Sequence, residues 1–232
     1  MLRVGLTGGL GSGKTTVAAY LRELGAEVVE ADALGRTLME PGQPVFEEIV
    51  GAFGPEVVGP DGRLNRVRLA EMAFQGGRLN DLNAIVHPAV IEAQRRWMEQ
   101  ILARDPAAVA VVESALIFEV ERDARARGEQ ESVLADWRRR IDRVVVVTAP
   151  DEMKIARYAA RIAPWPGPHR QDAEADARLR LAHQIPDSEK AQRADYVLQN
   201  TGDKVALRAQ VVDLWQRLKA ESNNSPLKES LE

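Results

Sequence analysis

Five short segments of the chain are rich in Val, Leu or Ile. A continuous apolar run of this kind is typical of a parallel strand buried on both faces, whereas a strand with one solvated face alternates apolar and polar residues. The pattern therefore predicts strands at Leu2–Thr7, Ala26–Glu30, Val109–Glu113, Arg143–Thr148 and Tyr196–Leu198.

Helical patterns separate most of these segments. Lys14–Leu24 is followed by Gly25, which favours a helix end, and Pro150–Ile162 has a proline in its first turn. Asp203–Ala220 carries apolar side chains at roughly helical spacing. Because strand and helix alternate, the predicted class is α/β, with a parallel five-stranded sheet flanked by helices.

One long stretch between two strands does not follow this alternation. Residues 32–105 predict consecutive helices, separated by turn signals such as "EPGQP" and "GPDGR". We therefore expect a helical insertion here, which leaves residues 1–31 and 106–232 as the core of a single domain.

Three further segments interrupt the second half of the chain. Residues 120–140 contain six arginines and five acidic residues, which is typical of a solvated helix or loop. Three prolines at alternate positions in "APWPGP" forbid a continuous helix there and predict a mobile loop, which we assign to a lid at residues 161–180. The polar residues 222–232 predict a flexible tail.

Composition narrows the class of protein. With 232 residues, 45% hydrophobic and 28% charged, the chain is long enough to bury one core that carries an insertion. The net charge of −4 gives no overall basic field, so we expect no nucleic-acid partner. The absence of cysteine excludes a disulfide framework and a cysteine nucleophile. Without a long apolar run, a signal-peptide pattern or a spare apolar stripe, we expect a cytoplasmic monomer with no membrane partner.

The first strand is followed by a glycine-rich segment, "GLTGGLGSGKTTVA". Its Gly8, Gly13, Lys14 and Thr15 fit the phosphate-binding pattern G-x-x-x-x-G-K-[ST], placed between a strand and a helix as the P-loop mechanism requires. Glycines let successive backbone N–H groups face an anion, and the helix N-terminus adds its dipole. The pattern predicts that ATP or GTP is bound by Gly11, Ser12, Gly13, Lys14, Thr15 and Thr16.

Two segments raise the alternative of a GTPase. "DALG" resembles a switch motif, and "NTGD" resembles the guanine-binding N-K-x-D. However, Asp32 follows Thr15 too closely to leave room for a switch loop and another strand, and Thr201 stands where a lysine would pack along guanine. We therefore favour a phosphotransferase over a GTPase.

A kinase needs a carboxylate near the acceptor hydroxyl, and Asp32 follows the neighbouring strand. Asp32 is therefore the predicted general base, with helix capping as the alternative interpretation. Glu113 ends the third strand, where it would help Thr15 hold Mg²⁺ or simply face solvent. Arg157 and Arg161 lie four residues apart on one predicted helix and would stabilise the transferring phosphate beneath the lid, as Lys14 would from the loop.

Taken together, the residues of nearly the whole chain resemble the dephospho-CoA kinase family. The resemblance rests on "VGLTGGLGSGKTTVA", "EADALGR", "DGRLNRVRLAEMAF", "LNAIVHPAV", "ALIFE" and "HQIPDSEKAQRADYVLQNTGD". It implies a nucleotide-kinase-like P-loop fold, a CoA-binding insertion and a lid. It also implies transfer of the ATP γ-phosphate, with Mg²⁺, to the ribose 3'-hydroxyl of dephospho-CoA, which completes coenzyme A synthesis.

The resemblance also implies roles for residues outside the P-loop. Arg36 and His87 would face the acceptor, although His87 could equally be a buried packing residue before a proline turn, and Asn200 would border the adenine. The chain departs from the family where Lys154 replaces a usual glutamine, where "ALI" replaces Pro-Leu-Leu, and where residues 120–140 and the lid are longer. These departures leave open which arginine reaches the γ-phosphate: Arg161 is preferred over Arg157, with Arg170 as a substitute.

Two other functions stay open at this level. One is a nucleoside or nucleotide kinase with another acceptor, and the other is a non-catalytic, nucleotide-dependent regulator.

Overall fold

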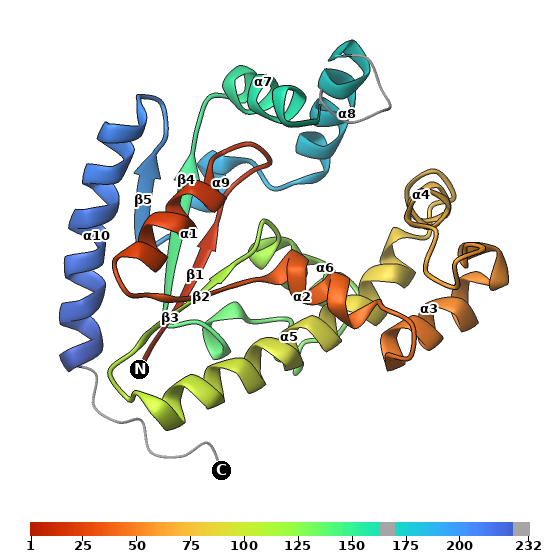
Figure 1. Cartoon of the computed structure of the whole chain (residues 1–232), viewed down its shortest axis with the longest axis horizontal. Helices are drawn as coiled ribbons and strands as arrows, with labels where there is room; N and C mark the ends of the chain where they lie inside the picture. Colours follow the sequence, from red (N-terminus) through yellow and green to blue (C-terminus); the bar gives the residue numbers. More distant parts are fainter. Residues whose placement is uncertain (163–169, 225–232) are drawn as a thin grey trace.

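The fold is described from a computed structural model, which covers residues 1–162 and 170–224. Five parallel strands form one sheet in the order β2-β3-β1-β4-β5 (Figure 1). This confirms the predicted α/β class, and each strand starts and ends within one residue of its predicted bounds. The strands are β1 Leu2–Thr7, β2 Glu27–Glu30, β3 Val109–Glu113, β4 Arg143–Thr148 and β5 Tyr196–Gln199.

The register of the sheet brings three strand ends to the same edge. Leu6 of β1 lies beside Glu113 of β3, and Glu113 in turn lies beside Glu30 of β2. Because the strands are parallel, the segments that follow β1, β2 and β3 all leave the sheet at this edge. In such sheets, ligands bind at the carboxyl ends of the strands.

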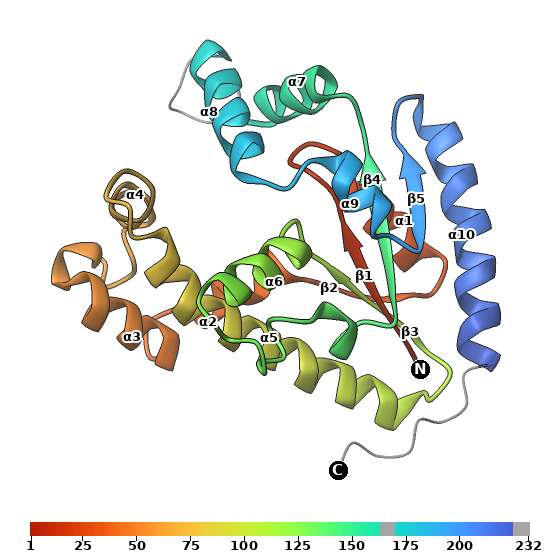
Figure 2. The ribbon, with the colours of Figure 1, turned by 180° about the vertical axis from the view of Figure 1, so that it is seen from behind.

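Helices cover both faces of the sheet (Figures 1 and 2). On one face, α1 (Lys14–Glu23) and α10 (Lys204–Asn224) bury Val17, Leu21 and Leu214 against the strands. On the other face lie α5 (Leu79–Arg104), α6 (Ile117–Ala126) and the short α9 (Asp187–Gln192). The central strands β1, β3 and β4 are therefore buried on both sides, which explains their continuous apolar pattern, whereas the edge strands β2 and β5 are only partly buried.

The segment between β2 and β3 is helical, as predicted. It runs through α2 (Ala31–Leu38), α3 (Pro44–Phe53), the 3₁₀ turn η1 (Pro55–Val57), α4 (Arg66–Ala70), the π-helical η2 (Glu71–Gln75) and the long α5. The helices of this insertion bury a small core of their own, which includes Phe46, Ile49 and Phe53. The predicted turn at Pro88 is wrong, because Pro88 lies inside α5 and the helix continues through it.

Residues 120–140 form helix and loop, as predicted, but the segment is only partly solvated. Helix α6 extends to Ala126, and a 3₁₀ turn, η3, follows at Trp137–Arg139. Val120, Leu134 and Trp137 are buried against neighbouring elements. The charged residues outnumber these apolar ones, so composition alone concealed the fact that the segment packs onto the core.

Helices α7 (Asp151–Ile162) and α8 (Arg170–His183) pack together above the strand ends, through Tyr158 and Ala177 among others (Figure 1). The predicted loop is thus helical from Arg170, since the prolines that forbid a helix precede it; residues 163–169 lie outside the described part.

Helix α10 continues into the predicted tail. It reaches Asn224, and its last turns are anchored by the buried Ser222 hydroxyl, which donates to the carbonyls of Ala107, at 2.9 Å, and Ala108, at 3.0 Å. The rest of the predicted tail, residues 225–232, lies outside the described residues.

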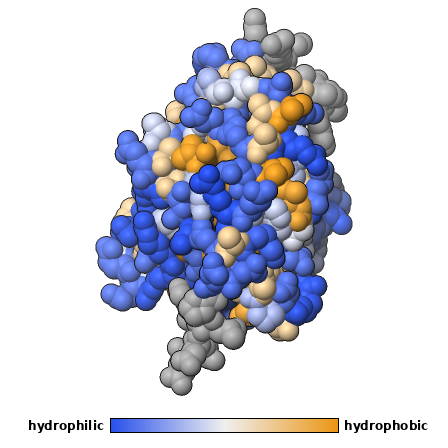
Figure 3. All heavy atoms as spheres, turned by 90° about the vertical axis from the view of Figure 1, so that its left-hand side faces the viewer, coloured by the Kyte–Doolittle hydropathy of each residue, from blue (hydrophilic) through white to orange (hydrophobic). Residues whose placement is uncertain are grey.

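The face that carries α10 is mostly hydrophilic, with small apolar patches separated by polar residues (Figure 3). Within residues 1–162 and 170–224, no helix is long and apolar enough to cross a membrane.

Candidate functional site

The phosphate loop lies between β1 and α1, and its glycines are required by its shape. Gly13, at the N-cap of α1, has φ 100°, and a Cβ there would lie 2.1 Å from the Asn200 side-chain nitrogen. Gly11 has φ 73°, and a Cβ there would lie 2.2 Å from the backbone oxygen of Lys154 in α7. Both the positive φ and the close neighbours exclude other residues, so glycine is needed at each position.

Lys14 is buried and turned back onto the loop. Its Nζ donates to the carbonyl oxygens of Gly8, at 3.0 Å, and Gly9, at 3.1 Å. Burial lowers the pKa of Lys14 to about 8, although the nearby Glu113 carboxylate opposes that shift. An anionic phosphate at this position would favour the charged ammonium and offer it a stronger acceptor than a neutral carbonyl.

Side chains from α9 and the turn before it occupy two backbone donors of the loop. The Gly9 N–H donates to Asp187 Oδ1 at 2.8 Å, and the Leu10 N–H donates to Gln184 Oε1 at 3.0 Å. Asp187 Oδ2 also pairs with Lys154 Nζ at 2.8 Å. Sequence analysis missed Asp187 and Gln184 because they lie more than 170 residues from the loop, although both fall in the family-like "HQIPDSEK" segment.

Thr15 and Glu113 meet at the carboxyl edge of the sheet, as predicted. The Thr15 hydroxyl donates to Glu113 Oε1 at 3.3 Å, and burial raises the pKa of Glu113. A hydroxyl and a carboxylate are hard oxygen ligands of the kind that Mg²⁺ prefers, so the pair fits this ion. Among the described residues, no cluster of three or more acidic or histidine side chains could hold a metal alone, so phosphate oxygens and water would supply the other ligands.

Asp32 lies in the first turn of α2, directly beyond β2. Its capping role is wrong, because Glu30 is the N-cap residue and no side chain caps this helix. Asp32 is close enough to Lys14 and Glu113 to affect the pKa of each, and it also lines a cavity between the insertion and the sheet. Asp32 therefore lies where the phosphate loop meets that cavity.

The cavity beside Asp32 measures about 340 Å³ and is enclosed by α2, α5, β3 and α6. Asp32, Arg36 and His87, which were predicted to share the acceptor site, all line it. Most of the remaining wall is apolar, with side chains such as Met39, Val86, Val90, Ile91, Leu116, Ile117 and Ile141. A cavity of this kind, with a few polar groups at fixed positions, is typical of a small-molecule site.

His87 combines the two interpretations that the sequence left open. Burial lowers the pKa of His87 to about 4, so the imidazole is neutral near pH 7. Its Nδ1 is buried and has no hydrogen-bond partner among the described residues, yet the residue lines the cavity. A buried polar atom without a partner indicates that a ligand or water completes its hydrogen bonding.

The two predicted arginines of α7 point to different places. Arg157 donates to the Asn200 backbone oxygen at 3.1 Å, and the Asn200 side chain donates to the Ser12 carbonyl at 2.8 Å. Arg161 is exposed and lies with its guanidinium carbon 5.4 Å from the centre of the Tyr158 ring. Arg157 therefore supports the phosphate loop indirectly, through Asn200, the residue that follows β5. Arg161, by contrast, is exposed and free to reorient. The Arg170 side chain lies outside the described residues.

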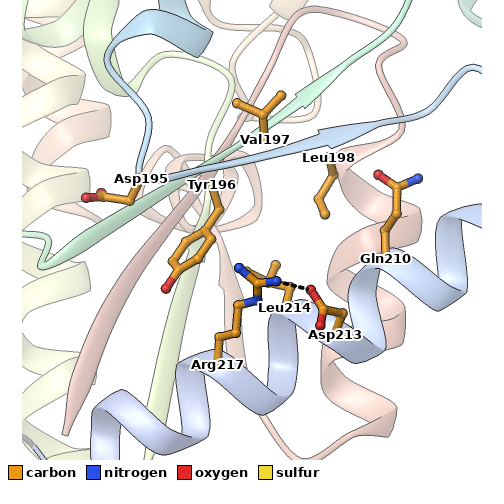
Figure 4. A pocket seen from close by; sticks show the side chains of 8 residues that line it. All are labelled: Asp195, Tyr196, Val197, Leu198, Gln210, Asp213, Leu214 and Arg217. Atoms are coloured by element: carbon orange, nitrogen blue, oxygen red, sulfur yellow. Dashed lines mark ion pairs between the residues drawn. The ribbon is translucent and has the colours of Figure 1, made fainter.

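A second hollow, of about 300 Å³, lies between β5 and α10 (Figure 4). Its polar residues already have partners: Arg217 pairs with Asp213 at 2.9 Å, and Gln210 bonds to the backbone of Gln199. We assign no ligand to this hollow, since the polar groups named here satisfy one another.

Comparison with known proteins agrees with this geometry. The sequence model described as Dephospho-CoA kinase matches residues 2–205. A dephospho-CoA kinase of Moorella thermoacetica is 36% identical, over 97% of this chain and 96% of its own.

Two solved structures extend the comparison. The crystal structure of a Thermus thermophilus protein is 32% identical, with a TM-score of 0.68, and the match covers 93% of this chain and 96% of that one. The dephospho-CoA kinase of Campylobacter jejuni, only 21% identical, shares the fold with a TM-score of 0.62 over 96% of this chain and 98% of its own. Since the family match spans most of the sequence, the chain belongs to the dephospho-CoA kinase family.

Proposed function

We propose that this chain transfers the γ-phosphate of ATP to the ribose 3'-hydroxyl of dephospho-CoA, with Asp32 as the general base. The observation that carries the assignment of Asp32 is its position, because it lines the cavity and also lies near Lys14 of the phosphate loop. The donor and acceptor sites therefore meet at one carboxylate. Family membership supplies the identity of the reaction.

At the nucleotide end, backbone N–H groups from Gly11 to Thr16 would bind the phosphates. Lys14 would leave the carbonyls of Gly8 and Gly9 and contact the β- and γ-phosphate oxygens. The Lys14 ammonium would then neutralise the charge that develops on the transferred group. Asn200, which contacts the loop at Ser12, would border the adenine.

At the acceptor end, the Asp32 carboxylate would accept the proton of the 3'-hydroxyl as that oxygen attacks phosphorus. Arg36 lies one turn further along α2 and also faces the cavity. Together with His87, it would bind polar groups of dephospho-CoA and fix the hydroxyl beside Asp32. Such orientation is a large part of catalysis in phosphoryl transfer.

Thr15 and Glu113 would hold Mg²⁺, Thr15 directly and Glu113 directly or through water. When bound there, the ion would neutralise phosphate charge during transfer.

Helices α7 and α8 would form the lid. Arg161, at the exposed end of α7, is the favoured arginine for the γ-phosphate, because Arg157 is already bonded to Asn200. Closure over ATP would exclude water and so limit hydrolysis of the nucleotide.

The reaction is tested by incubating the full chain with MgATP and dephospho-CoA. Formation of coenzyme A and ADP in equal amounts is expected. If another nucleoside or a sugar is phosphorylated while dephospho-CoA is not, the chain is a kinase with a different acceptor.

The role of Asp32 is tested by Asp32→Asn. We expect kcat to fall by about a hundredfold or more, because the amide cannot accept the hydroxyl proton, while ATP binding is retained. Glu30→Gln, one residue before α2, is the matched control and should retain most of the activity. Unchanged kcat in Asp32→Asn would contradict the assignment of Asp32.

A further inference from the structure

The charged segment at residues 120–140 forms part of the wall of the acceptor cavity. Val120 begins the segment, Arg140 ends it, and both line the cavity together with the next residue, Ile141. The question is which of its many charges reaches the ligand.

Most arginines of the segment bind the segment itself. Arg125 donates to the Ala135 carbonyl at 2.8 Å, Arg139 to the Glu131 carbonyl at 2.8 Å, and Arg140, through Nε, to the Val133 carbonyl at 3.0 Å. These bonds fix a loop that has little regular structure. They also fix the backbone that presents Arg140 to the cavity.

Arg140 and Arg127 each have a buried terminal nitrogen with no hydrogen-bond partner among the described residues, Nη2 in Arg140 and Nη1 in Arg127. Of the two, only Arg140 lines the cavity. The nearest carboxylates have other partners: Glu121 pairs with Arg125, at 2.8 Å, and with Arg193, while Asp136 accepts the Arg138 N–H at 3.0 Å. Arg140 is thus a cation in a cavity wall with spare hydrogen-bonding capacity.

A buried guanidinium without an anion is costly, so its retention needs a compensating partner. Burial lowers the pKa of Arg140 to about 10, which leaves the group charged near pH 7. His87, whose Nδ1 also lacks a partner, lines the same cavity. Two unpartnered polar atoms in one cavity point to a ligand with an anionic group.

We propose that Arg140 binds the diphosphate of dephospho-CoA, through its guanidinium group and a phosphate oxygen. This inference rests on the proposed function, because it assumes that dephospho-CoA occupies the cavity. The diphosphate is the part of that acceptor that carries negative charge, and guanidinium–phosphate pairs are strong, directional contacts. Arg140 is then a residue that selects acceptors bearing a diphosphate over uncharged nucleosides.

The test compares Arg140→Met with the wild-type chain at saturating MgATP. The KM for dephospho-CoA should rise about tenfold or more, whereas the KM for ATP should change less than about twofold. The inhibition constant of adenosine, measured against dephospho-CoA, should stay the same, since adenosine lacks the diphosphate. Arg208→Met, which is exposed on α10 and does not line the cavity, is the control and should leave all three constants unchanged.

Several results would overturn the inference. An unchanged KM for dephospho-CoA in Arg140→Met would do so, and so would an equal rise in the adenosine constant, which would place the contact on the nucleoside. If Arg140→Met does not fold, the same constants are measured for Arg140→Lys. Its KM for dephospho-CoA should rise about threefold, while the inhibition constant of adenosine stays the same. A wild-type chain inactive with dephospho-CoA would instead reject the proposed reaction.

Discussion

The phosphate loop and the acceptor cavity both lie beside Asp32, but most of the polar groups described in the two sites differ in their hydrogen bonding. Ser12 Oγ is an exception in the loop, because it is buried and has no partner among the described residues. In the loop, Lys14, Gly9 and Leu10 all bond to other groups of the protein. In the cavity, polar atoms of His87 and Arg140 have no partner among the described residues. The nucleotide must therefore replace internal hydrogen bonds, whereas the acceptor would complete missing ones.

This difference predicts different consequences of mutation. At the loop, a substitution alters a network that already exists in the protein, so both stability and ATP binding respond. In the cavity, a substitution removes a group that would gain a partner only when the ligand binds, so we expect it to weaken acceptor binding.

The largest expected effect is at Lys14. Lys14→Met removes the ammonium that neutralises the transferred phosphate, and kcat/KM should fall by about a thousandfold. Steady-state kinetics with MgATP and dephospho-CoA measure this loss. Lys204→Met, at the exposed start of α10, is the control and should have wild-type rates. If Lys14→Met retained a tenth of the activity, the role of Lys14 would be wrong.

An intermediate effect is expected at the pair of Lys154 and Asp187, which links α7 to the loop. Lys154→Met leaves the Asp187 carboxylate without its buried cation, so the Gly9 N–H shifts and the KM for ATP should rise about tenfold. Because Asp187→Leu together with Lys154→Met removes both charges, the double variant should be closer to wild type than the sum of the single changes predicts.

The matched control for this pair is also on α7. Glu152 pairs with Arg178 of α8 at 3.0 Å, with both side chains largely exposed. Glu152→Gln should leave the KM for ATP unchanged, since exposed pairs contribute little. Strict additivity in the Lys154 and Asp187 cycle would show that the two residues act independently, against the expected coupling.

The smallest expected effect concerns His87 and pH. The folded-state pKa, about 4, lies below the ordinary value of 6.5, so below pH 6.5 the unfolded chain takes up a proton that the folded chain does not. The contribution of neutral His87 to the free energy of unfolding is therefore fully present above pH 6.5 and is lost as the pH falls toward 4. Between pH 7 and 5.5, the loss should be about 1 kcal/mol.

Urea unfolding of the wild type and of His87→Gln at both pH values measures this difference. The variant should lose less stability on acidification, whereas the exposed His183→Gln should behave as the wild type does. Identical pH dependence in the wild type and His87→Gln would mean that His87 is not held neutral by the fold.

The two regions also differ in how far sequence could predict them. The phosphate loop was predictable because its function depends on consecutive residues, and glycine at positions 11 and 13 has a strict steric reason. The central strands β1, β3 and β4 were predictable because both of their faces are buried, which leaves a clear apolar pattern. Asp32 followed from its position after a strand.

The cavity was less predictable, because its wall is assembled from distant segments. Arg140 lies in a segment whose charge predicted solvent exposure, and only the fold shows that Leu134 and Trp137 anchor it. The partners of the loop, Asp187 and Gln184, depend on the return of α9 to β1 in space. The turn expected at Pro88 was wrong, because a proline usually ends a helix but the surrounding α5 tolerates this one.

The contact between Gly11 and α7 constrains how a lid can move. The Lys154 carbonyl occupies the place of a Gly11 Cβ, so the two backbones touch at this point. The first turns of α7 cannot swing inward without colliding with the loop. If α7 and α8 close as the proposed lid, the motion must pivot beyond Lys154. The start of α7 would then stay in place while the end that carries Arg161 moves.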